Sequence, residues 1–249
     1  MLNRLMQYGS RDRGPDTAIL TVALLILMVF LITETGSLEN SQTQEQVATS
    51  ELVPDFILVS FRIACSIVVL ITLTWIAIDK KGSTDYPLNF KERENLPRKV
   101  VGPTRLAAFT MCHFALIGVS FGFSGASSLI HISGGTVPKW ILIASPILFS
   151  TSYSCAILVT FIVTFRLIPS NLNKGLPIRN FFSWYEILMH NGNIVMLGTS
   201  LFLNGMDVQW QYFAYPVLFG IAYVAWAAVY ANYISGVFIY DFLDYRMKG

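Results

Sequence analysis

Charged residues are scarce in this 249-residue sequence. Asp, Glu, Lys and Arg make up 13% of it, whereas hydrophobic residues make up 54%. Because soluble domains carry about 25% charged residues, this composition excludes an ordinary water-soluble domain and favours the membrane class. The formal net charge is only +2, so the sequence predicts no nucleic-acid partner.

Cysteine is also rare. Cys65, Cys112 and Cys155 all lie in apolar stretches, where they are expected to act as small buried hydrophobic residues. They therefore form neither a disulfide framework nor a metal-ligand set. The sequence also lacks internal repeats and any Gly-rich phosphate loop placed before a helix. We predict no metal and no cofactor.

Long hydrophobic stretches dominate what is present. A helix needs roughly 20 apolar residues to cross the hydrocarbon core, and six stretches are long enough to consider: 17–33, 52–78, 105–129, 138–168, 185–203 and 213–240. The sequence therefore predicts an all-α fold, a polytopic membrane bundle of six transmembrane helices. We divide it into an N-terminal segment (1–16), a first helix or signal anchor (17–33) and a five-helix core (52–244). A cleaved secretory peptide is the alternative for the first helix.

Basic residues predict the orientation of these helices. They lie in segments 1–16, 79–104, 166–179 and 246–248, with Arg105 at the cytosolic mouth of the third helix, whereas the intervening loops carry none except Lys139. Cytosolic loops are enriched in Lys and Arg, so both termini are predicted to be cytosolic. Arg62 is the other exception among the 17 basic residues, and its partner stays open. An integral membrane protein of the endomembrane system or the plasma membrane is expected.

Polar residues inside the predicted helices gather at one depth. Thr110 and His113, His190 and Asn193, and Asn232 all lie roughly 6–14 Å from the cytosolic face. Residues three apart share a helix face, and polar groups in a membrane are often functional. Each residue alone also fits a structural hydrogen bond within or between helices. Their convergence makes the inner half of the bundle the candidate site.

Several motifs resemble those of one membrane-protein family. The likeness covers roughly residues 55–244 and rests on Phe109-Thr110, Lys139-Trp140, His190-x-x-Asn193, Tyr215-Pro216, Phe219-Gly220-x-x-Tyr223 and the run 239–244. In these residues the chain resembles the rolling-stone family and the related androgen-induced multi-pass hydrolases.

The resemblance implies a bundle with a site inside the membrane. In the hydrolase branch a Thr and a His act on fatty acid esters of hydroxy fatty acids, and that Thr corresponds to Thr110. The branch carries two His three residues apart, and the second one is catalytic. Here the pair is His190 and Asn193, the rolling-stone form, and Asn cannot accept a proton from the Thr hydroxyl.

Two function classes follow, and the first is the one that the sequence favours. One is a non-catalytic membrane protein, such as an adhesion factor or an accessory subunit with membrane-protein partners. The other is an intramembrane ester hydrolase in which Thr110 attacks and His190 is the base, with His113, Asn193 and Asn232 as substrate-binding residues. The lipid bilayer, and a lipid or fatty-acid ester ligand, are the expected partners. Transport is less favoured, because no inverted repeat is evident.

Overall fold

The structure is a computed structural model that describes residues 7–8, 13–89 and 94–248, and it is predominantly helical. The elements run β1(Gln7–Tyr8), α2(Gly14–Thr35), α3(Gln44–Ala48), α4(Asp55–Ile78), β2(Ser83–Asp85), β3(Arg98–Val100), η1(Gly102–Ala107), α5(Phe109–Ile132), α6(Lys139–Ile162), η2(Val163–Leu167), α7(Ile168–Asn173), η3(Arg179–Phe182), α8(Trp184–Ile187), η4(Leu188–Gly192), α9(Asn193–Leu203), η5(Trp210–Phe213), α10(Ala214–Val229), η6(Tyr230–Ser235), η7(Asp241–Leu243) and β4(Met247–Lys248).

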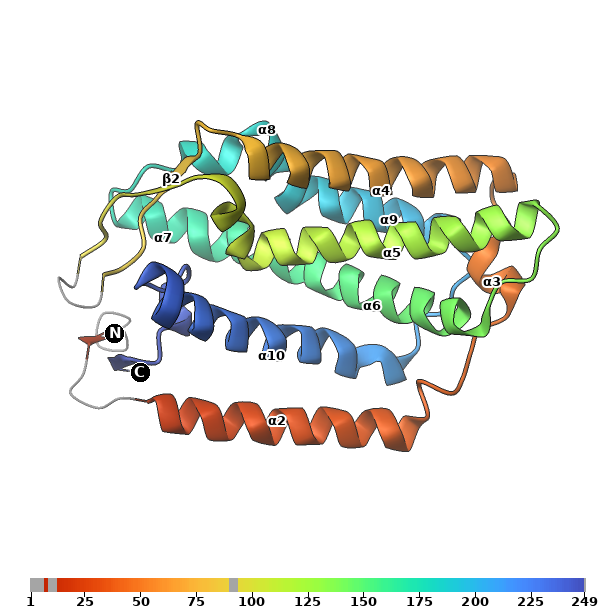
Figure 1. Ribbon diagram of the computed structural model, residues 1–249, viewed down its shortest axis with the longest axis horizontal. Helices are drawn as coiled ribbons and strands as arrows, with labels where there is room; N and C mark the ends of the chain where they lie inside the picture. Colours follow the sequence, from red (N-terminus) through yellow and green to blue (C-terminus); the bar gives the residue numbers. More distant parts are fainter. Residues whose placement is uncertain (1–6, 9–12, 90–93, 249) are drawn as a thin grey trace.

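The long helices lie side by side and run between two ends of the molecule (Figure 1). The β2–β3 hairpin and the β1–β4 pair lie at one end, here called the terminal end (Figure 1). The short helix α3 lies at the other, here called the α3 end (Figure 1). Among the described residues, the strands form two small antiparallel pairs, β1 with β4 and β2 with β3. The predicted all-α bundle is confirmed.

Within the part of the chain that the structure describes, five helices are long and apolar enough to cross a membrane: Gly14–Thr35, Asp55–Ile78, Phe109–Ile132, Lys139–Asn173 and Trp210–Ser235. The protein is thus a multi-pass membrane protein by length and composition. The remaining predicted span, 185–203, is also helical, through α8, η4 and α9. It is less apolar than the others, because Glu186, His190, Asn191 and Asn193 interrupt it.

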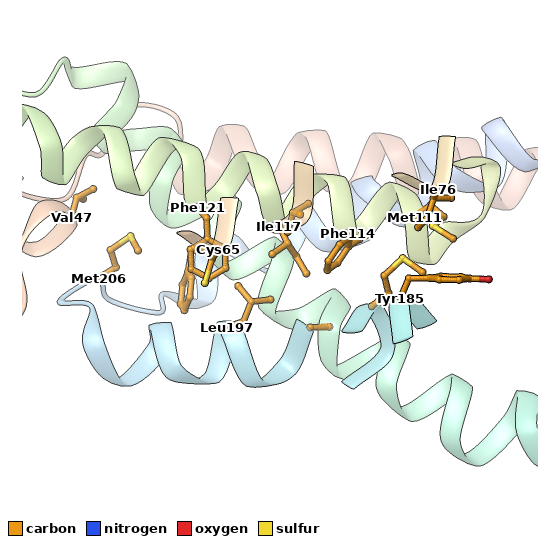
Figure 2. Close-up of a cluster of buried hydrophobic side chains, with 14 residues drawn as sticks. Val47, Cys65, Ile76, Met111, Phe114, Ile117, Phe121, Tyr185, Leu197 and Met206 are labelled. Atoms are coloured by element: carbon orange, nitrogen blue, oxygen red, sulfur yellow. The ribbon is translucent and has the colours of Figure 1, made fainter. Parts of the chain in front are cut away.

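The core of the bundle lies between α4, α5, α6 and the α8–α9 segment. Figure 2 shows Phe114, Ile117 and Phe121 of α5 between the α5 ribbon and Leu197 of α9, all within one buried cluster. Helices α4 and α5 approach closely at Gly118, where an added Cβ would come within 2.8 Å of the Val69 side chain. Small residues permit such approaches between membrane helices.

Arg62 is completely buried in α4, near the α3 end. Its Nη1 donates to the carbonyl oxygens of Val47 (2.8 Å) and Ser124 (3.1 Å) and to Ser128 Oγ (2.6 Å). The acceptors of these three hydrogen bonds are all uncharged oxygen atoms. The partner left open by the sequence is therefore the C-terminal end of α3 together with α5.

Helix α2 joins the bundle through α10. Met28 and Ile32 are buried against Ala214, and Ser37 Oγ lies 2.7 Å from Tyr215 Oη. Near the terminal end, Arg13 N donates to Tyr245 O at 3.1 Å. The helix is therefore held at both ends, while most of its length faces outward.

The last helix ends earlier than predicted. The stretch 213–240 was expected to be one span, but the helical segment stops at Ser235, and Gly236 adopts a left-handed conformation (φ 76°). A left-handed glycine is a common way to end a helix. The chain after it turns back, so Tyr240 lies outside the helix that was predicted to contain it.

Candidate functional site

A polar cavity of about 240 Å³ lies at the terminal end of the bundle. The β2–β3 hairpin and the segments after α6 and α10 contribute to its wall, together with the start of α5 and the α8–η4 segment. Its chemistry-bearing side chains are Asp85, Arg98, Arg105, Thr110, Asn171, Asn180, Glu186, His190, Tyr230 and Tyr240.

Two ion pairs fix the basic side chains of this cavity. Arg98 Nε donates to Asp85 Oδ1 at 3.1 Å, which ties β3 to β2. Burial alone would lower the pKa of the Arg98 guanidinium, but hydrogen bonding and charge attraction from Asp85 raise that pKa above its ordinary value. Arg105 Nη1 lies 3.0 Å from Asp79 Oδ2. Both cations are thus held in place before any ligand arrives.

Three π-helical turns border the cavity. The segments η2, η4 and η6 contribute Leu167, His190 and Tyr230 to its wall. A π-turn breaks the regular hydrogen-bond ladder of an α-helix and is frequent at functional sites. Here all three helices that carry such a turn carry it at the same end of the bundle.

His190 is held by groups on both sides. Its Nε2 lies 3.3 Å from Glu186 Oε2, one turn earlier in the same helix, and Thr160 Oγ1 donates to its backbone carbonyl at 2.5 Å. The other ring nitrogen, Nδ1, is buried and has no protein hydrogen-bond partner among the described residues. The contact with Glu186 therefore orients the imidazole ring.

Thr110 and Tyr240 meet at the inner edge of the cavity. Thr110 Oγ1 lies 3.5 Å from Tyr240 Oη, at the long limit for a hydrogen bond. Burial raises the pKa of the Tyr240 phenol, so this phenol stays protonated and can donate a hydrogen bond.

A larger, mostly apolar cavity of about 960 Å³ lies on the other side of Thr110. Its walls come from α2, α6 and α10 and from the segment 240–245. Thr110, Leu167 and Tyr240 line both cavities. Polar and apolar compartments therefore share one boundary, and two of the three boundary side chains carry a hydroxyl group.

The structure brings together part of the predicted site. Thr110 and His190 line the same polar cavity. His113 is fully buried beside it, and its Nε2 donates to Ser152 O at 2.9 Å. Asn193 is also fully buried, and its Oδ1 accepts from Ile194 N at 2.6 Å. His113 and Asn193 lie outside the lining of both cavities.

Asn232 lies apart from the predicted cluster. Its side chain is exposed, and Nδ2 donates to Ala228 O (2.8 Å) and to Tyr245 Oη (2.9 Å). It also lies outside the lining of both cavities. A shared depth along the membrane normal does not by itself identify the residues of one site, because depth does not say which way a side chain faces.

Several site residues were missed by the sequence analysis. The Glu186–His190 pair carries a readable signal, because residues four apart share a helix face. Tyr240 was expected at the end of the predicted span 213–240, and nothing in a one-dimensional pattern shows that the chain turns back after Gly236. The residues of the β2–β3 hairpin lie in the basic segment 79–104, which in the sequence indicated only the orientation of the helices, whereas the hairpin forms part of the cavity wall.

No protein-family model, no curated protein and no solved structure matches the chain. Within the described residues, no group of three or more His, Cys, Asp or Glu side chains is placed to hold a metal ion. What the site offers is a hydroxyl pair, an oriented imidazole and fixed charges next to a large apolar space. These groups suit a molecule with a polar head and an apolar tail.

Proposed function

We propose that this protein is a rolling-stone-like membrane protein with six spans and both termini cytosolic, and that it binds a lipid at the boundary between its two cavities. The observation that carries the proposal is that Thr110, Leu167 and Tyr240 line both compartments. An acyl chain in the apolar cavity would place the lipid's polar group beside Thr110 and Tyr240.

The chemistry of the two compartments supports an amphiphilic ligand. Ligand sites are typically apolar cavities with a few well-placed polar groups. The apolar cavity offers Leu24, Val159 and Ile221 among other aliphatic side chains, whereas the polar cavity offers Arg98 and Glu186. A water-soluble metabolite would leave the larger compartment without complementary contacts, because apolar surface is best covered by apolar groups.

A second candidate function is ester hydrolysis, and it is favoured by the Glu186–His190 pair, which lines the same cavity as Thr110. The Thr110 hydroxyl would attack the ester carbonyl while the His190 imidazole takes its proton. The alcohol would then leave with that proton, and water would release the acid from the acyl-threonine. Glu186 would orient the imidazole through Nε2, the role of the third member of a catalytic triad. Tyr240, whose hydroxyl lies 3.5 Å from Thr110 Oγ1, would donate to the developing oxyanion in place of Asn193.

Lipid binding can be tested by filling the apolar cavity from α10. Gly220 lines this cavity and has open space around it, so Gly220→Leu places four carbons where the acyl chain would lie. We expect at least tenfold weaker labelling by a photoreactive, alkyne-tagged palmitic acid analogue in membranes. Gly198 also faces open space but lies outside the cavity lining, so Gly198→Leu is the matched control. Equal labelling of the two variants would overturn lipid binding in this cavity.

Hydrolysis is tested separately with an alkyne-tagged fluorophosphonate, a probe for activated hydroxyl nucleophiles. If Thr110 is a nucleophile, Thr110→Ala abolishes labelling, Thr110→Ser retains it, and His190→Gln reduces it by at least 100-fold. Labelling that persists in Thr110→Ala would refute the catalytic assignment. Palmitate-probe binding without any fluorophosphonate labelling would leave the protein as a lipid binder without this chemistry.

A further inference from the structure

Helix α2 forms one complete wall of the apolar cavity. Its lining residues are Arg13 at the helix start, then Thr17, Leu20, Thr21 and Leu24. They are spaced four, three, one and three residues apart, the spacing of a single helix face. The Thr21 hydroxyl donates to Thr17 O at 2.7 Å, so this face presents little unsatisfied polarity to a ligand.

The lining residues of the other walls show how far the apolar cavity extends from its boundary with the polar cavity. Along α6 and η2 the lining runs from Leu167, at the boundary with the polar cavity, back to Ser154. At 1.5 Å per residue this is about 20 Å. With C–C bonds of about 1.5 Å, an extended chain advances roughly 1.3 Å per carbon, so this wall matches about 15 carbons. Leu24 is the α2 lining residue farthest from Arg13, and so from the terminal end.

The cavity is open towards the bilayer. Leu20 of α2 and Leu158 of α6 both line it, yet their side chains are 61% and 50% exposed. An opening lined by such side chains suits an acyl chain arriving from the surrounding membrane. The three side chains that it shares with the polar cavity, Thr110, Leu167 and Tyr240, distinguish it from a groove that merely borders annular lipid.

We propose that α2 is the specificity-determining wall of the acyl site, and that Leu24 sets the longest chain the site accepts. The inference rests on the proposed lipid binding and adds a substrate class to it, namely long single chains of about 15 carbons supplied by the bilayer. It also assigns a role to α2, which the family resemblance does not cover.

The test compares neighbouring leucines of α2. Leu24 lines the cavity, whereas Leu25 lies outside its lining and is 41% exposed. Leu24→Trp and Leu25→Trp are each labelled in membranes with photoreactive, alkyne-tagged fatty acids of about ten and about sixteen carbons. We expect Leu24→Trp to lower the ratio of sixteen-carbon to ten-carbon labelling at least tenfold, and Leu25→Trp to keep the wild-type ratio.

Each outcome has a distinct meaning. Retained ten-carbon labelling of Leu24→Trp shows that this variant is folded. If Leu24→Trp and Leu25→Trp share the wild-type ratio, the role of α2 is refuted while lipid binding stands. If Leu24→Trp loses both probes, Thr21→Trp and Leu24→Phe are measured in the same way, and an unchanged ratio in both also refutes it. If the wild-type protein is labelled by neither probe, the proposed lipid binding itself fails.

Discussion

At the scale of single residues, Arg62 is a charged side chain that is completely buried in the bundle. A buried guanidinium costs desolvation free energy, yet here it gives three hydrogen bonds to the end of α3 and to α5. Its role is to fasten the α3 end of the molecule. Ser128 Oγ joins the same network by donating to Ala48 O at 2.7 Å.

Replacing Arg62 should loosen that end. In Arg62→Met the apolar stem is kept but the hydrogen bonds to the carbonyls of Val47 and Ser124 are lost, so we expect the free energy of unfolding to fall by about 2 kcal/mol. Thermal unfolding of the purified variant in detergent measures this. Arg62→Lys keeps the charge but not the planar donor set and should be intermediate. An unchanged or higher melting temperature for Arg62→Met would show that the desolvation cost outweighs the bonds.

Some residues of the candidate site could be predicted from the sequence. Others could not, because their positions depend on the three-dimensional fold. Thr110 and His190 were found because a polar group inside an apolar run is visible in one dimension. His113 and Asn193 were found by the same rule, but they make their hydrogen bonds away from the cavities. Arg98 and Tyr240 could not be found, because their place depends on a hairpin and a reversal of the chain. Local pattern gives depth, whereas only the fold gives direction.

At the scale of elements, the long helices were predictable because each is a long apolar run with polar ends. The observed boundaries of these helices differ from the predicted ones where another element adjoins the helix. Helix α5 begins at Phe109 rather than near residue 105, because η1 precedes it. The β2–β3 hairpin was missed, since three-residue strands carry too few alternating positions to be read.

The hairpin depends on Gly82, which gives a prediction at this scale. Gly82 has φ of 68°, and a Cβ there would collide with the Val100 carbonyl oxygen of β3. Gly82→Ala should therefore destabilise the hairpin by about 1–3 kcal/mol and speed tryptic cleavage after Lys80, Lys81 and Lys99. Limited proteolysis in membranes measures this.

Gly134 supplies the matched control for that experiment. Its φ of 78° is similar, but a Cβ there would meet nothing within 4 Å. Gly134→Ala should thus show backbone strain alone and leave cleavage of the hairpin unchanged. If Gly82→Ala resists trypsin as well as Gly134→Ala does, the close contact with β3 does not hold the hairpin in place.

At the scale of the whole molecule, the six-span arrangement depends on whether 184–203 crosses the membrane. That segment is the least apolar of the predicted spans because it carries the site residues Glu186 and His190. The buried Met189 and Leu197 pack it into the core, which supports a crossing. The positions of the flanking loops decide the question directly.

Thiol labelling of intact cells gives a clear readout of this arrangement. In a variant with Cys65, Cys112 and Cys155 replaced, single cysteines are introduced by Lys80→Cys, Lys174→Cys, Glu45→Cys and Val208→Cys. A membrane-impermeant maleimide should label Glu45→Cys and Val208→Cys from one side of the membrane. It should label Lys80→Cys and Lys174→Cys only from the other side. Labelling of Lys174→Cys and Val208→Cys from the same side would contradict a crossing by 184–203 and leave five spans.

The open seam between α2 and α6 has a practical consequence for handling the protein. Detergent tails are alkyl chains, so extraction would load the apolar cavity with solubilising agent at high concentration. Tail length should then govern how well the purified protein survives heating. In long-tailed detergent, the purified protein would resemble the lipid-bound state. Bound detergent would then compete with added fatty acid in a binding assay, and a control without fatty acid would not reveal this competition. Nanodiscs with defined phospholipids are the cleaner starting point for any binding assay.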